Sequence, residues 1–258
     1  DLARNDLVQR LQADPGSRLV GLGRGGLSLE TPLIPNLATV HQLNDLRGYF
    51  VMLPQRFSTL AQRYLSRERN YYFADSVTSQ NFLNIFGVKY LLCERRTCGP
   101  YHNRFSVAQE RGDVVLLTNS TALPTAYVAY NTQGYTDPSD VFSALEDDRV
   151  DVSMVTLVEG VASRRSTLPI SPAVVHWAVN TITISANATE AGVLVVSDNA
   201  YPGWRASVNG VPGQVLTVWG SLKGVAVPAG QSTVVFTYRP RLFMVGMGVS
   251  FLAVVLLG

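Results

Sequence analysis

The stretch VLVVSDNAYPGWRASVNG (residues 193–210) indicates the fold of the C-terminal half of the chain. An apolar run leads into a loop of acidic, aromatic, proline and glycine residues, and an alternating segment then stops at Asn-Gly. Alternation of apolar and polar residues predicts a half-buried strand, and Asn-Gly is a strong signal for a hairpin turn. The stretch therefore predicts two antiparallel strands joined by a loop with more polar and aromatic groups than a turn requires.

Similar short segments surround this stretch and predict the rest of a sheet structure. They read VVHWAVN, TITISAN, GQVLTVW, KGVAVP and STVVFTY, and turn residues separate them at short, regular spacing. Such a series is typical of an antiparallel β-sandwich, which we expect over residues 165–241.

Residues 1–160 carry a different pattern, in which helices and strands are mixed. Residues 54–65 place apolar side chains at helical spacing, and NIFGVKYLLC reads as a helix end followed by a buried strand. We therefore expect an α+β fold, with a mixed α/β domain over residues 1–160 followed by the sandwich.

The last segment, LFMVGMGVSFLAVVLLG (residues 242–258), contains no charged residue. A membrane-spanning helix needs about 20 apolar residues, so the run is interpreted as the start of a transmembrane helix rather than as a core element. Across the chain, 47% of the residues are hydrophobic and the net charge is only +2, which argues against a nucleic-acid partner.

No cofactor, metal or catalytic group is predicted from the motifs. GLGRGG (residues 21–26) matches the spacing of a dinucleotide-binding loop, but Pro32 and Pro35 prevent the helix that such a loop must enter. Cys93 and Cys98 predict either a disulfide or a pair of thiols. A metal site with His102 would lack a fourth ligand. A disulfide would require an oxidising, extracytoplasmic compartment.

Two segments hold candidate binding residues. In the first, Tyr201, Trp204 and Arg205 could form a rim that stacks on a sugar, with Asp198 and Asn199 as hydroxyl partners. The alternative makes Trp204 a core side chain, since alternation points it inward, and Asp198 an anchor of the loop.

The second segment is NDLRGY, which contains Asn44, Asp45, Arg47 and Tyr49 and lies between predicted elements. Binding residues gather in such loops. A structural Asp45–Arg47 pair is the alternative.

Several motifs resemble YfhO-type bacterial membrane proteins. These are residues 193–210, VPAG (227–230), VVFTYRP (234–240) with the apolar run that follows, and, further upstream, LNDLRGYFVMLPQRF (43–57) and NIFGVKYLL (84–92). Proteins of this family are similar to C-type membrane glycosyltransferases, which have many spans and use a lipid-phosphate-linked sugar.

The resemblance implies that the catalytic acid lies on a loop near the first spans, so no residue of this chain inherits that role. It also implies a bacterial cell-membrane location, with the soluble part extracytoplasmic. We expect a non-catalytic domain that assists binding of a glycan, a polymer acceptor or a lipid-linked sugar. The alternative is a carbohydrate-binding or adhesive surface module with a single anchor. The sequence predicts no oligomeric state.

Overall fold

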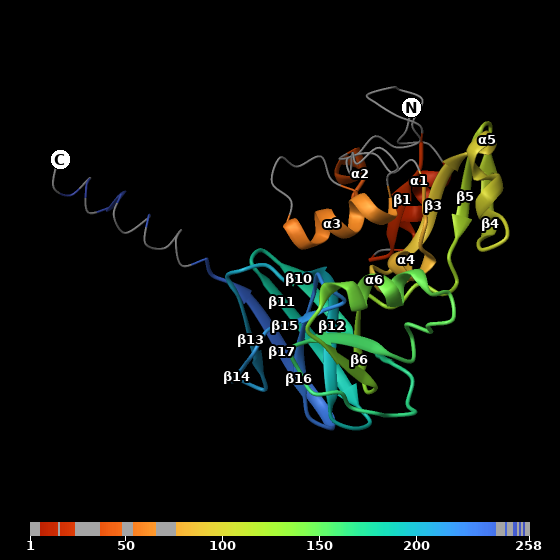
Figure 1. Cartoon of the computed structure of the whole chain (residues 1–258). Coiled ribbons are helices and arrows are strands. Elements are labelled where there is room, and N and C mark those ends of the chain that lie inside the picture. The colour runs from red at the N-terminus through yellow and green to blue at the C-terminus, as the bar shows by residue number, and fades with distance from the viewer. Residues whose placement is uncertain are drawn as a thin grey trace. The chain divides into compact units, whose positions relative to one another are not determined.

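The computed structural model describes residues 6–14, 16–23, 37–47, 54–65 and 76–240, together with 246, 250, 251, 253 and 255. The chain divides into two compact units (Figure 1). Unit 1 comprises Asp1–Thr125 and Thr136–Val155, and unit 2 comprises Ala126–Tyr135 and Thr156–Gly258. The chain therefore passes between the units three times, whereas the sequence pattern suggested a linear division between residues 160 and 165.

Unit 1 contains helices and one mixed sheet. Its elements are α1 (Asp6–Gln12), β1 (Arg18–Gly21), α2 (Leu37–Val40), β2 (Asn44–Asp45), α3 (Gln55–Tyr64), α4 (Gln80–Ile85), β3 (Val88–Glu94), α5 (Arg95–Cys98), a short 3₁₀ turn (Gly99–Tyr101), β4 (Ser106–Arg111), β5 (Val114–Thr118) and α6 (Pro138–Glu146). The strand order is β2-β1-β3-β5-β4. The strands β2, β1 and β3 are parallel, and β3, β5 and β4 are antiparallel.

Helix α3 shows how the apolar pattern produces the core of unit 1. Phe57, Leu60, Ala61 and Tyr64 follow one another at the spacing of one helical face, and all four are buried. The ring of Phe57 packs edge-on against Phe86, with 5.4 Å between the ring centroids. The predicted helix is therefore confirmed.

As far as Tyr238, the regular elements of unit 2 are all strands. They are β6 (Ala126–Ala129), β7 (Thr132–Tyr135), β8 (Thr156–Glu159), β9 (Ser171–Pro172), β10 (Val174–Ala178), β11 (Thr181–Ala188), β12 (Gly192–Asn199), β13 (Trp204–Val208), β14 (Val211–Gly213), β15 (Leu216–Val218), β16 (Leu222–Val227) and β17 (Gly230–Tyr238). One sheet has the order β10-β11-β17-β13-β14, and the other β7-β8-β15-β16-β12-β6-β9.

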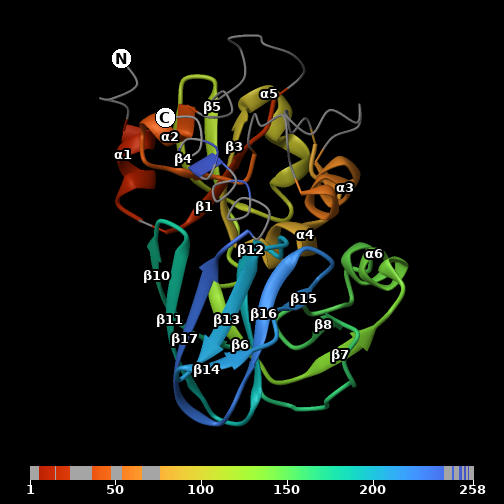
Figure 2. The same ribbon diagram turned by 90° about the vertical axis from the view of Figure 1, so that its left-hand side faces the viewer.

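The two sheets of unit 2 share one core, as in a β-sandwich. Figure 2 shows β10, β11, β17 and β13 in order across one sheet, with β12 and β16 in the other. Along β17, Val234 and Phe236 are buried while Gln231 and Thr233 are exposed. This period of two points one face inward, where it meets side chains such as Leu194 of the opposite sheet.

The predicted transmembrane helix lies mostly outside the described residues. Of residues 242–258 the structure describes only five, all helical and exposed: Gly246, Ser250, Phe251, Ala253 and Val255. Within the part of the chain that is described, no helix combines the length and the apolar character needed to cross a bilayer.

Candidate functional site

The loop of residues 200–203 connects β12 of one sheet to β13 of the other. The pairing of β12 with β16 is interrupted by a bulge between Val196 and Asn199. A bulge changes the direction in which the neighbouring side chains point. It lies immediately before the loop, where Ser197 and Asp198 leave the regular ladder.

Asp198 forms an ion pair with a lysine buried between the sheets. The Lys223 side chain comes from β16, is fully buried, and places Nζ 2.6 Å from Asp198 Oδ2. The same Nζ lies 3.3 Å from the centroid of the Trp204 ring, which belongs to the facing sheet. Lys223 shares its strand face with Val225 and Val227 of the core. One ammonium therefore links β12, β16 and β13 across the sandwich.

Burial determines the protonation behaviour of this lysine. Removal from water lowers the pKa of Lys223 below its ordinary value of 10.5, and the nearby Asp198 carboxylate offsets part of that effect. A buried charge without compensation is costly. Asp198 and the electron-rich face of Trp204 together supply the compensation here.

Asn199 anchors the start of the loop. Its Oδ1 accepts a hydrogen bond of 2.7 Å from Ser221 Oγ, and the next residue, Ala200, donates its backbone N–H to the carbonyl of Ser221 at 2.6 Å. Asp198 and Asn199 thus both hold the loop to the strand hairpin beside it.

The other half of the loop forms an open groove lined by aromatic rings. Residues 201–205 and 238–240 enclose about 480 Å³. We call this the aromatic groove. The ring of Tyr238 lies 5.3 Å from that of Trp204 and 6.2 Å from that of Tyr201. Tyr201 is 48% exposed. Arg205 and Arg239 add two guanidinium groups to the lining.

Gly203 allows the loop to approach the end of β17 closely. Its φ of +110° is unfavourable for residues with a side chain, and a Cβ there would lie 2.9 Å from the Tyr238 ring. Its carbonyl accepts a hydrogen bond of 2.8 Å from the backbone N–H of Arg239. The glycine therefore fixes one wall of the aromatic groove.

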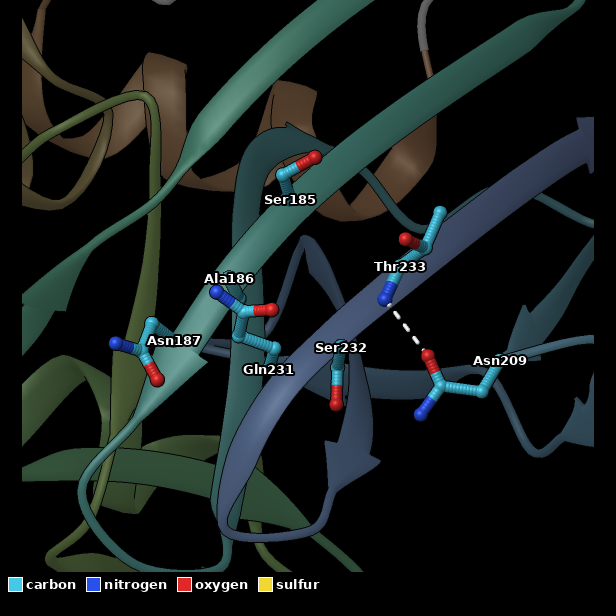
Figure 3. Close-up of a pocket in the computed structure, with 7 residues that line it drawn as sticks. All are labelled: Ser185, Ala186, Asn187, Asn209, Gln231, Ser232 and Thr233. Atoms are coloured by element: carbon cyan, nitrogen blue, oxygen red, sulfur yellow. Dashed lines mark hydrogen bonds between the residues drawn. The ribbon is translucent and has the colours of Figure 1, made fainter.

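Unit 2 also has a polar pocket of about 360 Å³ on the outer face of the same sheet (Figure 3). It is lined by Ser185, Ala186, Asn187, Asn209, Gln231, Ser232 and Thr233. Asn209 Oδ1 accepts a hydrogen bond of 2.8 Å from the backbone N–H of Thr233. The exposed amides and hydroxyls carry no charge, and they can both donate and accept hydrogen bonds.

The second candidate segment lies in unit 1 and forms a buried pair. Arg47 donates to Asp45 through Nη2 at 2.7 Å and through Nε at 3.1 Å, and both side chains are almost fully buried. Asn44 is exposed on β2, which pairs with β1. Tyr49 lies outside the described residues. These contacts correspond to the structural alternative for Asp45 and Arg47.

Cys93 and Cys98 form a disulfide that joins the end of β3 to α5. Both cysteines are fully buried. In unit 1, therefore, the cysteines act as a short cross-link.

Three residues of unit 2 were missed as candidates: Lys223, Tyr238 and Arg239. Lys223 is one of only two lysines in the chain and falls in a strand where alternation points it inward, which is the signal that could have identified it. Tyr238 and Arg239 belong to the YRP segment immediately before the apolar run. Their position beside the loop follows from the pairing of β13 with β17.

Comparison with known proteins yields one family. The model described as bacterial membrane protein YfhO matches residues 161–250. No curated protein and no solved structure matches the chain. The matched range includes the loop, Lys223, the aromatic groove and the polar pocket. Over residues 161–250 the chain is therefore similar to the YfhO family of bacterial membrane proteins.

Proposed function

We propose that this chain is a non-catalytic, extracytoplasmic part of a glycosyltransferase-like membrane protein, and that unit 2 binds a glycan in the aromatic groove. One observation carries the proposal. Three aromatic rings, Tyr201, Trp204 and Tyr238, lie next to one another in an open groove, with Tyr201 substantially exposed.

The chemistry of the groove suits a sugar. The apolar face of a pyranose stacks on an aromatic ring, and small polar groups at the rim fix its orientation. Arg205 and Arg239 present planar donors that bond to hydroxyl, carboxylate or phosphate oxygens. Because Lys223 and Asn199 hold the loop from the interior side, the groove is largely formed before a ligand arrives.

The test is a glycan titration of the detergent-solubilised chain with glucose, galactose, N-acetylglucosamine and their disaccharides. Binding is followed by tryptophan fluorescence, since Trp204 lies in the groove. We expect Tyr201→Ala to weaken binding about three- to tenfold, the range of one lost aromatic contact. Tyr201→Phe keeps the ring and should bind as the parent does.

Asn187→Ala, in the polar pocket, is the matched control, because Asn187 is exposed on the same unit but lies outside the groove. If Asn187→Ala weakens binding and Tyr201→Ala does not, the glycan occupies the polar pocket instead. A parent that binds none of these sugars would overturn glycan binding.

A further inference from the structure

The hairpin between β10 and β11 ends in an apolar residue where a polar one is normal. Its turn is Val179–Asn180, with Asn180 at φ +59° and Val179 90% exposed. Turns favour Gly, Asn, Asp, Ser and Pro, each for a reason of backbone geometry or hydrogen bonding. A β-branched apolar side chain at the tip gains nothing from folding in water.

A second apolar group accompanies it. Trp177 lies two residues before Val179 on β10, the edge strand of its sheet, and is 51% exposed. We call Trp177, Val179 and Asn180 the hairpin tip. Tryptophan is the side chain most typical of the boundary between water and lipid.

The hairpin tip lies at the end of the sheet where β17, the last strand of unit 2, stops. The carbonyl of Asn180 accepts a hydrogen bond of 2.9 Å from the backbone N–H of Tyr238, the last residue of β17. Thr181 is paired with Thr237, next to the pairing of Trp204 with Tyr238. Figure 2 shows the β10–β11 connection and the end of β17 at the same end of unit 2.

The sequence places an apolar run immediately beyond this end. Four peptide units separate Tyr238 from Leu242, so their Cα atoms can be at most about 14 Å apart. From Leu242 onward seventeen residues carry no charge, and the YfhO match covers both the hairpin and the start of this run. The headgroup layer on each side of a bilayer is about 5–8 Å thick.

The charges nearest to this end also suit a membrane surface. Arg205 and Arg239 line the adjoining groove, and basic side chains at the surface attract anionic lipid headgroups. Tyr201, 48% exposed beside them, is another ring of the type enriched at the interface.

We propose that the hairpin tip inserts into the headgroup layer of the bilayer and holds this end of the sheet against the membrane. The occupant of the exposed Trp177–Val179 surface is lipid. The proposal rests on the similarity of residues 161–250 to a family of membrane proteins and on the exposure of the tip, and it does not depend on glycan binding.

Spin labelling tests this placement in the full 258-residue chain, reconstituted into vesicles of phosphatidylethanolamine and phosphatidylglycerol at 3:1. Because the native cysteines are joined in a disulfide, a cysteine introduced as Val179→Cys is the intended target of the label under non-reducing conditions. Val211→Cys is the matched control, since Val211 is also an exposed valine of this sheet, at 67%. By strand register it lies four residues, roughly 14 Å, farther from the end of the sheet at which β17 stops.

The measured quantity is the ratio of the label's collision rate with oxygen to its collision rate with a water-soluble nickel chelate. We expect this ratio to be several-fold higher at position 179 than at position 211. Equal ratios at the two positions would overturn the proposal. So would spin–spin broadening at position 179 that disappears on dilution with unlabelled chain, because the tip would then contact a second copy. The Tyr201→Ala titration is read separately, so either proposal can fail alone.

Discussion

Replacing Asp198 by Asn should destabilise unit 2 far more than replacing its partner Lys223 by Met. In Asp198→Asn the ammonium remains fully buried without a counter-charge. Removing one partner of a buried ion pair costs about 3–5 kcal/mol. Trp204, whose ring centroid is 3.3 Å from Nζ, still holds the ammonium, and Asp198 is a third exposed in the parent. We therefore expect the free energy of unfolding of unit 2 to fall by about 3 kcal/mol at pH 7.

In Asp198→Asn, Lys223 can also lose its proton, which removes the buried charge. The cost of this deprotonation is therefore an upper limit on the loss of unfolding free energy. Taking the ordinary pKa of 10.5 for Lys223, deprotonation costs about 5 kcal/mol at pH 7 and about 2 kcal/mol at pH 9. Since burial lowers the pKa of this lysine, the unfolded chain binds more protons between the folded and the unfolded pKa. Stability therefore rises with pH across that window. The window is wider in Asp198→Asn, because the carboxylate that raises the pKa is gone.

Lys223→Met behaves differently because nothing charged stays buried. Methionine fills most of the lysine volume, and the carboxylate of the partly exposed Asp198 remains hydrated. The change should cost no more than about 1 kcal/mol or should stabilise the unit, and it should remove the rise with pH.

The assay is urea unfolding in detergent at pH 7 and pH 9, followed by tryptophan fluorescence. All three tryptophans, Trp177, Trp204 and Trp219, lie in unit 2, so the signal reports this unit alone. Equal losses in the two variants, or a loss in Asp198→Asn that is the same at both pH values, would refute the reasoning.

Three further predictions concern the groove and the disulfide. Trp204→Ala should cost unit 2 about 3 kcal/mol, because it removes a large ring that also covers the Lys223 ammonium. Tyr201→Ala should change the stability by less than about 0.5 kcal/mol. Urea unfolding distinguishes the two variants, and a stable Trp204→Ala protein would contradict the assigned strand face. Gly203→Ala should destabilise unit 2 by about 1–3 kcal/mol through its positive φ and its contact with Tyr238, and an unchanged unfolding midpoint would argue against the loop geometry. Reducing the Cys93–Cys98 disulfide should cost unit 1 about 2 kcal/mol, seen by circular dichroism as a lower melting temperature with no change in tryptophan fluorescence. Thiol titration of the unreduced, denatured chain should find no free thiol. Two free thiols would contradict the disulfide.

Local patterns predicted the helices and strands whose buried face is visible in their own sequence. The helical stripe of α3 and the alternation along β11 and β17 each specify one apolar face, so these elements could be read without knowing what covers them. The hairpin of β4 and β5 has a signal of the same local kind, because Arg111-Gly112 interrupts two strand patterns.

Pairing between distant segments could not be read in this way. The strand β6 joins β12 of unit 2 although more than sixty residues separate them, and β8 joins β15 in the same sheet. Nothing in the local pattern of β6 distinguishes a strand of unit 1 from one of unit 2. The site has the same limit: an anchor of the loop was one of two interpretations of Asp198, but its partner Lys223 follows from the register of β12 and β16.

The three passages of the chain between the units have a consequence for how unit 2 can be obtained and how it folds. A fragment restricted to the family-matched residues 161–250 would lack β6, β7 and β8, three of the seven strands in one sheet. It would leave the edge of β12 unpaired from Val193 to Val196, where β6 normally lies. Such an apolar edge promotes aggregation, so a fragment that begins before Ala126 is the sound choice.

The order of these strands along the chain also matters during synthesis on the ribosome. Val193 emerges 64 residues after Ala129, the residue with which it pairs in the native sheet. At about 5–20 residues per second, β6 waits roughly 3–13 s for this partner strand. The apolar AYVA segment must remain unpaired with β12 during that interval, and an unpaired apolar strand is prone to aggregate.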